Sequence, residues 1–181
     1  MREPARPWTR TTKRVAKKAF VKGVPDAKIH QFEMGDSARF RSGGFDTAFD
    51  LVLGDTVQIR DNALESSRLI ANKYFETRIL LNNYFFKVLV YPHQCIREHT
   101  MQSGAGADRL SSGMKHAFGR PIGRAAVVRK GQAVMRVWTT KEHAEKAREG
   151  LARAACKIPG RAHVVSGVGQ LAFKNNWKAP C

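Results

Sequence analysis

The segment AVMRVWTTKEHAEKAREGLARAACKIPG, residues 133–160, decides the fold class of this chain. Its first seven residues, 133–139, are mostly apolar and predict a strand. Small or apolar side chains then recur with the spacing of one helix face, with Thr140 as the expected N-cap and Pro159-Gly160 as the end. These side chains are Ala144, Ala147, Leu151, Ala154, Ala155 and Ile158. A strand followed by a one-sided helix predicts a helix lying on a sheet.

A second helix is predicted upstream, over residues 62–80, with Asp61 or Asn62 as its cap. Asn82-Asn83 breaks the pattern. One face of this helix carries the following side chains, the last two adjoining the others: Leu64, Ser67, Ala71, Tyr74, Arg78, Arg68 and Phe75.

Short apolar runs supply the strands of the predicted sheet. The fold starts near residues 29–34, and residues 36–46 read as a loop. Residues 49–59 predict either two short strands or one bulged strand, and further strands are expected at 84–91, 96–101, 125–128 and 162–165. The order predicts an α+β fold, a two-layer sandwich of two helices packed on a mixed or antiparallel sheet.

The charge of the chain is strongly positive and unevenly distributed. The 181 residues carry a formal net charge of +17, with a pI of about 10.5. Residues 31–96 are close to neutral, whereas residues 1–30, 97–130 and 131–181 are all basic. This excess indicates a polyanionic partner, and three charged zones favour a large folded RNA over a short single strand.

Residues 1–22 predict an extended basic arm. Such a segment is either a solvated charged tail or an arm that orders on a nucleic acid, and the charge elsewhere favours the second interpretation. Its cations are Arg2, Arg6, Arg10, Lys13, Arg14, Lys17, Lys18 and Lys22.

Residues 104–124 form a long glycine-rich segment with almost no aliphatic side chains, which is unusual inside a compact domain. We expect a functional loop at 101–120. Gly119 and Gly123 flank Pro121 and would allow close passage of the chain against a sugar-phosphate surface. Hydroxyls and spaced cations suit phosphate contacts. They are Arg109, Ser111, Ser112, Lys115, Arg120 and Arg124.

Nucleotide and metal sites find little support in the sequence. Lys115 is followed by His116, so the GxxxxGK[ST] pattern of a P-loop is missing, and no GxGxxG occurs. His93, Cys95 and His99 could share a strand face, but no second cluster completes a four-ligand site. We expect neither a metal nor a cofactor.

The cysteine pattern and the hydropathy indicate a reduced, intracellular protein without a membrane span. Cys95, Cys156 and Cys181 form no CxxC pair, and the first two lie in apolar runs typical of small core residues. No apolar stretch approaches the ~20 residues that a membrane span needs. Ser112 and His116, at helical spacing, are the only residues that suggest a catalytic site. Phosphate contact is the more common role of hydroxyls beside cations, so this suggestion is weak.

Several motifs occur in the same order in one known family. They are GVPDAKI (23–29), ALE (63–65) with Arg68, ANKY (71–74), YPH (91–93), GADRL (106–110) with GM (113–114), AFGRP (117–121), GQ (131–132) and PGR (159–161). Over about residues 5–172 the chain resembles the archaeal and eukaryotic large-subunit ribosomal protein L-ten-e, kin to bacterial L-sixteen. The chain stops near residue 181, without the eukaryotic C-terminal extension, so the resemblance is to an archaeal form.

The resemblance implies a structural protein of the large ribosomal subunit in the cytoplasm, without catalytic activity. Such proteins bind large-subunit rRNA beside the aminoacyl-tRNA cleft, near the peptidyl-transferase centre, and contact tRNA transiently and neighbouring ribosomal proteins. Their fold is a hammerhead-like α+β sandwich. The segment matching 102–118 points toward tRNA, with Arg109, Lys115 and His116 at its RNA-facing part. Lys115-His116 departs from the Arg-Gly of eukaryotic members.

These arguments divide the chain into the arm at 1–22, one RNA-binding domain at 23–172 and a tail at 173–181. The alternatives are a generic basic RNA- or DNA-binding module and an RNA-modifying enzyme using Ser112 and His116. Beyond the arm and loop cations above and His116, the predicted RNA-binding residues are Lys28, Arg97 and Arg161.

Overall fold

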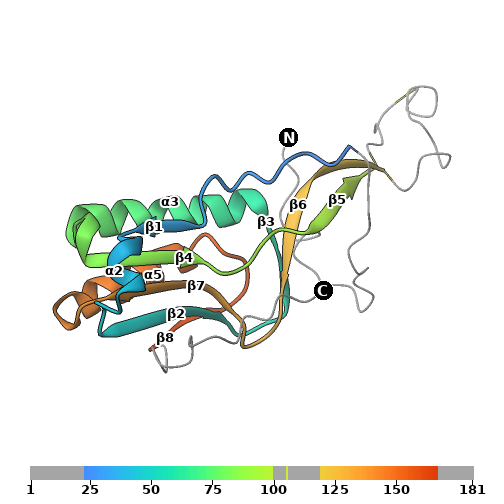
Figure 1. Ribbon diagram of the computed structural model, residues 1–181. Coiled ribbons are helices and arrows are strands. Elements are labelled where there is room, and N and C mark those ends of the chain that lie inside the picture. The colour runs from blue at the N-terminus through green and yellow to red at the C-terminus, as the bar shows by residue number, and fades with distance from the viewer. Residues whose placement is uncertain (1–22, 100–104, 106–118, 167–181) are drawn as a thin grey trace, which may run out of the picture.

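The structure is a computed structural model that describes residues 23–99, 105 and 119–166 (Figure 1). These residues form eight strands, three α-helices and two 3-10 turns. In chain order they are β1 (Glu33–Gly35), α2 (Ser37–Arg41), β2 (Thr47–Leu53), β3 (Val57–Arg60), α3 (Asp61–Arg78), η1 (Leu81–Asn83), β4 (Tyr84–Val88), β5 (Gln94–Glu98), β6 (Arg120–Val128), β7 (Ala133–Thr139), η3 (Lys141–His143), α5 (Ala144–Ala155) and β8 (Ala162–Ser166).

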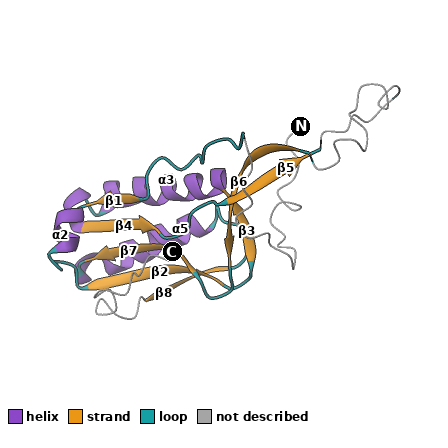
Figure 2. Ribbon diagram, turned by 45° about the vertical axis from the view of Figure 1, so that its right-hand side comes forward, coloured by secondary structure: helices purple, strands orange, loops and turns teal. Residues whose placement is uncertain are grey.

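The larger of two sheets has five strands in the order β1-β4-β7-β2-β8, and every neighbouring pair is antiparallel. Helices α3 and α5 lie side by side on one of its faces (Figures 1 and 2). Leu51, Met135 and Phe86 point into this layer and are fully buried. The predicted α+β class with two helices on one sheet is confirmed, and the sheet is antiparallel.

The two helices approach each other closely at a glycine. A Cβ atom on Gly150 would lie 2.1 Å from Cε1 of Phe75, so only glycine fits there. Two hydrogen bonds flank this contact: Ser67 Oγ donates to the carbonyl of Ala154 at 2.9 Å, and Tyr74 donates its hydroxyl proton to Glu149 at 2.6 Å. The second bond lowers the pKa of Glu149 and raises that of Tyr74.

A buried ion pair ties α3 to β1. Arg68 donates from Nε to Glu65 Oε2 at 2.8 Å and from Nη2 to Oε1, while its Nη1 meets the sulfur of Met34 at 3.2 Å. Hydrogen bonding to Arg68 lowers the pKa of Glu65, and the same bond raises the pKa of Arg68. Arg68 is therefore a structural cation of the protein interior.

The other face of the large sheet carries one row of charged side chains. Glu33, Lys87, Arg136 and Asp50 are register partners on β1, β4, β7 and β2. Lys87 pairs with Glu33, and Arg136 pairs with Asp50 through both carboxylate oxygens. Two carboxylates and two cations pair off, so the row carries no net charge.

Beside that row, α2 covers the end of the same face. Phe40 on α2 stacks on Phe85, with ring centroids 4.4 Å apart, and contacts Trp138. Phe45 completes this aromatic cluster, which is separate from the main core. The sequence predicted a loop over 36–46, which is wrong at α2. The helix has only five residues and none of their side chains is buried, so the sequence shows no apolar periodicity there. The one local signal is Asp36, which caps the helix by accepting a hydrogen bond from Arg39 N at 2.9 Å.

The second sheet has three antiparallel strands in the order β3-β6-β5. It stands at one end of the large sheet, and β5 and β6 extend beyond it as a two-stranded ribbon (Figure 1). Residues 49–59 therefore supply two strands that belong to different sheets. The prediction of a single sheet is wrong, because strand periodicity shows which side chains are buried but not which strands pair.

Both predicted helix caps also differ from the structure. Arg60 holds the N-cap position of α3 without a side-chain bond, while Asp61 is the first helical residue and accepts from the backbone of Asn62 and of Lys28. Thr140 precedes the turn η3 rather than α5 and makes no capping bond. At α3 the helix begins one residue earlier than expected, and at α5 the turn η3 separates the expected cap from the helix.

Some strand ends and cysteine positions differ as well. β4 ends at Val88, β5 begins at Gln94, and β6 begins at Arg120 instead of at residue 125. Cys95 is half-buried and Cys156 is exposed, so the interpretation of Cys156 as a core residue is wrong. The extension of β6 matters most, because it turns part of the predicted loop into a paired strand.

Candidate nucleic-acid interface

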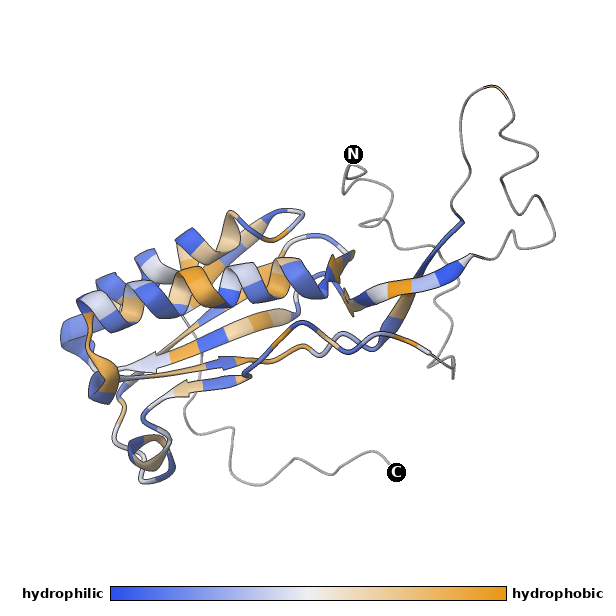
Figure 3. Ribbon diagram, turned by 90° about the horizontal axis from the view of Figure 1, so that it is seen from above, coloured by the Kyte–Doolittle hydropathy of each residue, from blue (hydrophilic) through white to orange (hydrophobic). Residues whose placement is uncertain are grey.

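The β5–β6 ribbon carries three of the predicted RNA-binding residues, Arg97, Arg120 and Arg124. At its distal end Glu98 faces Arg120 and Arg97 faces Pro121, and a register shift lies between Ile96 and Arg97. Such an irregularity bends and twists a strand pair, and it accommodates Pro121, which has no N–H for the ladder. The ribbon end is hydrophilic in Figure 3 and projects away from the helix layer.

Gly119 closes the distal end of the ribbon. Its φ is +77°, and a Cβ atom there would lie 2.5 Å from the carbonyl carbon of Glu98 and 2.8 Å from the amide nitrogen of His99. Its carbonyl accepts a hydrogen bond from Arg97 Nη1 at 2.8 Å. Gly119 was expected to let the chain pass close to a sugar-phosphate surface, but here it lets the chain pass close to the protein's own backbone. Gly123 has open space around it.

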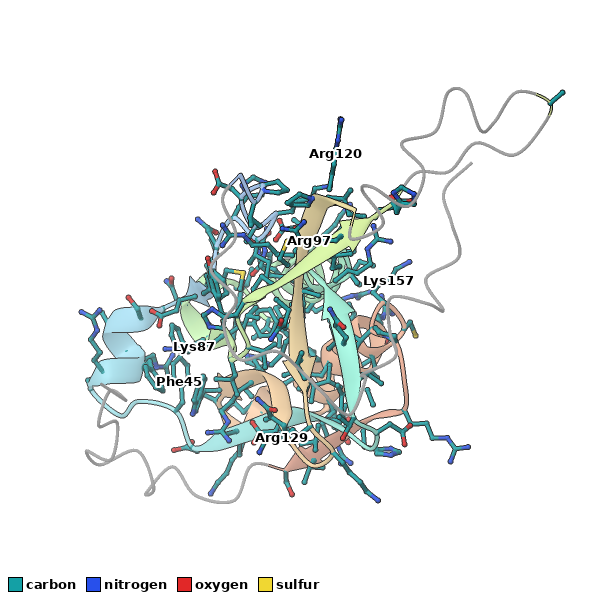
Figure 4. The ribbon with its side chains drawn as sticks, turned by 90° about the vertical axis from the view of Figure 1, so that its right-hand side faces the viewer. Phe45, Lys87, Arg97, Arg120, Arg129 and Lys157 are labelled. Atoms are coloured by element: carbon teal, nitrogen blue, oxygen red, sulfur yellow. The ribbon has the colours of Figure 1, made fainter. Side chains whose placement is uncertain are left out.

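The three ribbon arginines differ in how they can meet a phosphate. Arg120 is exposed and points outward from the ribbon, while Arg97 lies beside it on β5 (Figure 4). Arg97 is half-buried and positioned by Gly119. The five N–H donors of an arginine allow it to serve more than one acceptor. Arg120, exposed at the ribbon tip, therefore suits contact with a phosphate or a base.

Arg124 has a structural contact nearer the base of the ribbon. Its Nε donates to the carbonyl of Pro25 at 2.8 Å, and Nη2 lies 3.9 Å from the carboxylate of Asp26. Asp26 is fully exposed, so that ion pair contributes little. Arg124 holds residues 25–28 against the ribbon, and the exposed side chain of Lys28 lies on this same segment.

Arg161 lies elsewhere, in the turn before β8. Its side chain is exposed and its carbonyl accepts from Gly54 N at 2.8 Å. The structure thus brings the Lys28 segment to Arg124, at the base of the ribbon, and places Arg161 apart from the ribbon. The remaining predicted residues lie outside the described residues and stay predictions: Arg2, Arg6, Arg10, Lys13, Arg14, Lys17, Lys18, Lys22, Arg109, Ser111, Ser112, Lys115 and His116.

His99 lies at the end of the ribbon, and the sequence offered it, with His93 and Cys95, as a member of an incomplete metal cluster. Its Nε2 is buried and has no hydrogen-bond partner in the described part of the chain. Within the same residues, no three potential metal ligands lie together, and no helix is long and apolar enough to cross a membrane. The ribbon adds to the described surface one exposed arginine, Arg120, and two half-buried ones, Arg97 and Arg124.

Comparisons with known proteins point in one direction. Residues 8–165 match the family described as "Ribosomal protein L16p/L10e". The chain is similar to "Large ribosomal subunit protein uL16" of Archaeoglobus fulgidus, with 43% identity over 96% of this chain and 97% of that protein. The protein of the same name from Staphylothermus marinus is 48% identical over 82% and 83% of the two chains, and that from Methanococcus aeolicus 42% over 88% and 90%.

Proposed function

The chain belongs to the ribosomal protein L16p/L10e family in its archaeal form, and on this premise we propose that it binds large-subunit rRNA beside the aminoacyl-tRNA cleft, near the peptidyl-transferase centre. It is a structural constituent of the large ribosomal subunit, which is cytoplasmic in archaea. Family membership also makes it a ribosomal protein rather than an enzyme. Its partners there are rRNA and neighbouring ribosomal proteins.

The observation that supports RNA binding most strongly is the β5–β6 ribbon. It carries Arg120 exposed and Arg97 positioned by a backbone acceptor, both at the end that projects from the body. Arg68 and Arg136, in contrast, pair with carboxylates inside the protein. The ribbon tip therefore places an exposed guanidinium group, that of Arg120, on a paired strand that projects from the body.

The second part of the proposal concerns tRNA. Residues 101–120 connect the two strands of the ribbon, so a projecting ribbon would carry this segment to whatever the tip approaches. Arg109 and Lys115 supply cations there, and Ser111 and Ser112 supply hydroxyls. Such groups would contact the phosphates of an aminoacyl-tRNA transiently, as rRNA holds the ribbon in place.

Tethered cleavage in assembled subunits tests both parts. Arg120→Cys, made with Cys95, Cys156 and Cys181 changed to Ser, carries an iron cleavage reagent at the ribbon tip. We expect strand breaks in rRNA lining the tRNA cleft and in aminoacyl-tRNA bound there. The matched control carries the reagent at Lys73→Cys, on the exposed face of α3.

The control reagent should leave aminoacyl-tRNA intact. Cleavage of bound tRNA from position 73 but not from position 120 would contradict the proposed orientation. Absence of the protein from large subunits would contradict the assignment as a whole. A function as a generic basic RNA-binding module predicts breaks scattered over unrelated RNAs instead.

A further inference from the structure

Three turns meet where the two sheets join, at residues 54–56, 129–131 and 157–161. Gly54 N donates to the carbonyl of Arg161 at 2.8 Å, and Gly131 N donates to the carbonyl of Leu53 at 2.7 Å. Lys130 N donates to the hydroxyl of Thr56 at 3.2 Å. These bonds join the turns into one surface, although they are distant in the sequence.

The conformations of these turns depend on glycines. Gly131 and Gly160 have φ of +80° and +89°, a region that other L-residues rarely adopt. A Cβ atom on Gly160 would lie 3.3 Å from Cγ1 of Val57, so the third turn packs directly against the start of β3. The backbone under this surface is fixed, and side chains on it project from defined positions.

Four cations project from the three turns, and we name this group the junction patch: Arg129, Lys130, Lys157 and Arg161. All four side chains are exposed, and within the described residues their charged groups make no hydrogen bond or ion pair. The turns contribute one carboxylate, Asp55. The patch therefore carries a clear positive excess, on the side of the molecule seen in Figure 4.

The junction patch is separate from the ribbon tip. Arg120 opens β6 and Arg129 directly follows its end, so nine residue steps separate them. Nine strand steps at about 3.3 Å each cover roughly 30 Å, several times the roughly 8 Å over which charges are screened at physiological salt. Arg120 and Arg129 lie at opposite ends of the view in Figure 4. The two groups of cations thus act as independent electrostatic sites, held at a fixed spacing by one strand.

We propose that the junction patch binds a second stretch of RNA backbone, separate from the stretch that the ribbon tip contacts. This inference rests on the proposed function, because it takes rRNA as the ligand. An acidic protein segment is the competing partner, but protein interfaces are built around apolar or aromatic side chains. The large exposed apolar side chains of the described residues lie elsewhere, at Leu69, Leu80, Leu81, Tyr91, Ile122 and Val165.

The patch is tested by salt-dependent binding of the full chain to purified large-subunit rRNA. Lys130→Gln with Lys157→Gln removes two exposed charges without removing a side-chain contact seen in the structure. Each lost phosphate contact lowers the slope of log K against log salt by about 0.7 to 0.9. We expect the slope to fall by about 1.4 to 1.8, so that the unaltered chain loses about tenfold more affinity than the variant between about 50 and 200 mM salt.

The matched control is Lys73→Gln with Lys141→Gln, which removes two exposed lysines from the helix layer and from η3. Its slope should equal that of the unaltered chain. Hydroxyl-radical footprinting on the same RNA should show the junction variant losing protection at one segment. Arg120→Gln should lose protection at a different segment.

Equal slopes and footprints for the junction variant and its control would overturn the inference while leaving the proposed function in place. An unchanged slope together with loss of a neighbouring protein from assembled subunits would overturn it in favour of a protein partner. An unaltered chain that fails to bind large-subunit rRNA would overturn both the inference and the proposed function.

Discussion

Gly119→Ala should loosen the tip of the β5–β6 ribbon while leaving the helix–sheet body intact. Alanine at a φ of +77° is strained by about 1 to 2 kcal/mol. Its Cβ would also sit 2.5 Å from the carbonyl carbon of Glu98, so the strands must separate, and the bond from Arg97 to the Gly119 carbonyl is lost. That bond adds about 1 kcal/mol, giving about 2 to 3 kcal/mol in total.

Amide hydrogen exchange measures this cost locally. A loss of 2 to 3 kcal/mol raises exchange rates by roughly 30- to 150-fold. The faster exchange should be confined to β5 and the start of β6, because local opening of the ribbon does not require unfolding of the core. Exchange in α3 and β7 should stay as it is.

Gly123→Ala is the matched control on the same strand. Gly123 has no atom within 4 Å of the added Cβ and an ordinary φ, so the change should be neutral or slightly stabilising. The reasoning fails if the two variants exchange alike, or if Gly119→Ala leaves the ribbon as protected as before.

Three further results are expected. A glycine-to-alanine change normally stabilises a helix by about 1 kcal/mol, but Gly150→Ala should lower the free energy of unfolding by about 1 to 2 kcal/mol in urea titrations, because its Cβ would overlap the ring of Phe75. An increase in stability, or no recovery of stability when Phe75→Leu is added, would contradict this. Arg68 lowers the pKa of Glu65 in the folded protein, so this pair should stabilise the fold fully above pH about 4.5, and its stabilisation should be lost as the pH falls through the lowered pKa of the folded state. Glu65→Gln should cost about 3 kcal/mol of unfolding free energy at pH 7 and flatten this dependence on acid pH. A pH profile of stability that Glu65→Gln leaves unaltered would argue against the pair. Arg120→Gln should weaken rRNA binding with no change in melting temperature, and a lower melting temperature would mean that this arginine is structural.

The sequence predicted the helix layer well because its signals are local. Leu64 and Ala71 on α3 and Ala147 and Leu151 on α5 recur at helical spacing, and all four are buried as expected. Gly150, which interrupts the small-residue pattern, is explained only by the ring of Phe75 against it. That contact joins residues 75 positions apart, so no local pattern could indicate it.

The candidate interface was predictable in composition but not in shape. Arg97 and Arg120 were selected as cations near a glycine-rich segment, yet the start of β6 at Arg120 depends on pairing with β5 across more than 20 residues. Gly119 was assigned to an RNA contact, whereas the backbone of Glu98 is what requires it. Of the junction patch the sequence predicted only Arg161, because the four cations lie on turns that only the fold brings together.

Ultraviolet crosslinking in purified large ribosomal subunits tests the central claim most directly, namely that this chain holds rRNA through its projecting ribbon. After nuclease and protease digestion, nucleotide adducts are mapped to peptides by mass spectrometry. The account predicts adducts from large-subunit rRNA on peptides covering residues 94–99 and 119–124. Adducts confined to the exposed faces of α3 and α5, with none on the ribbon peptides, would contradict it.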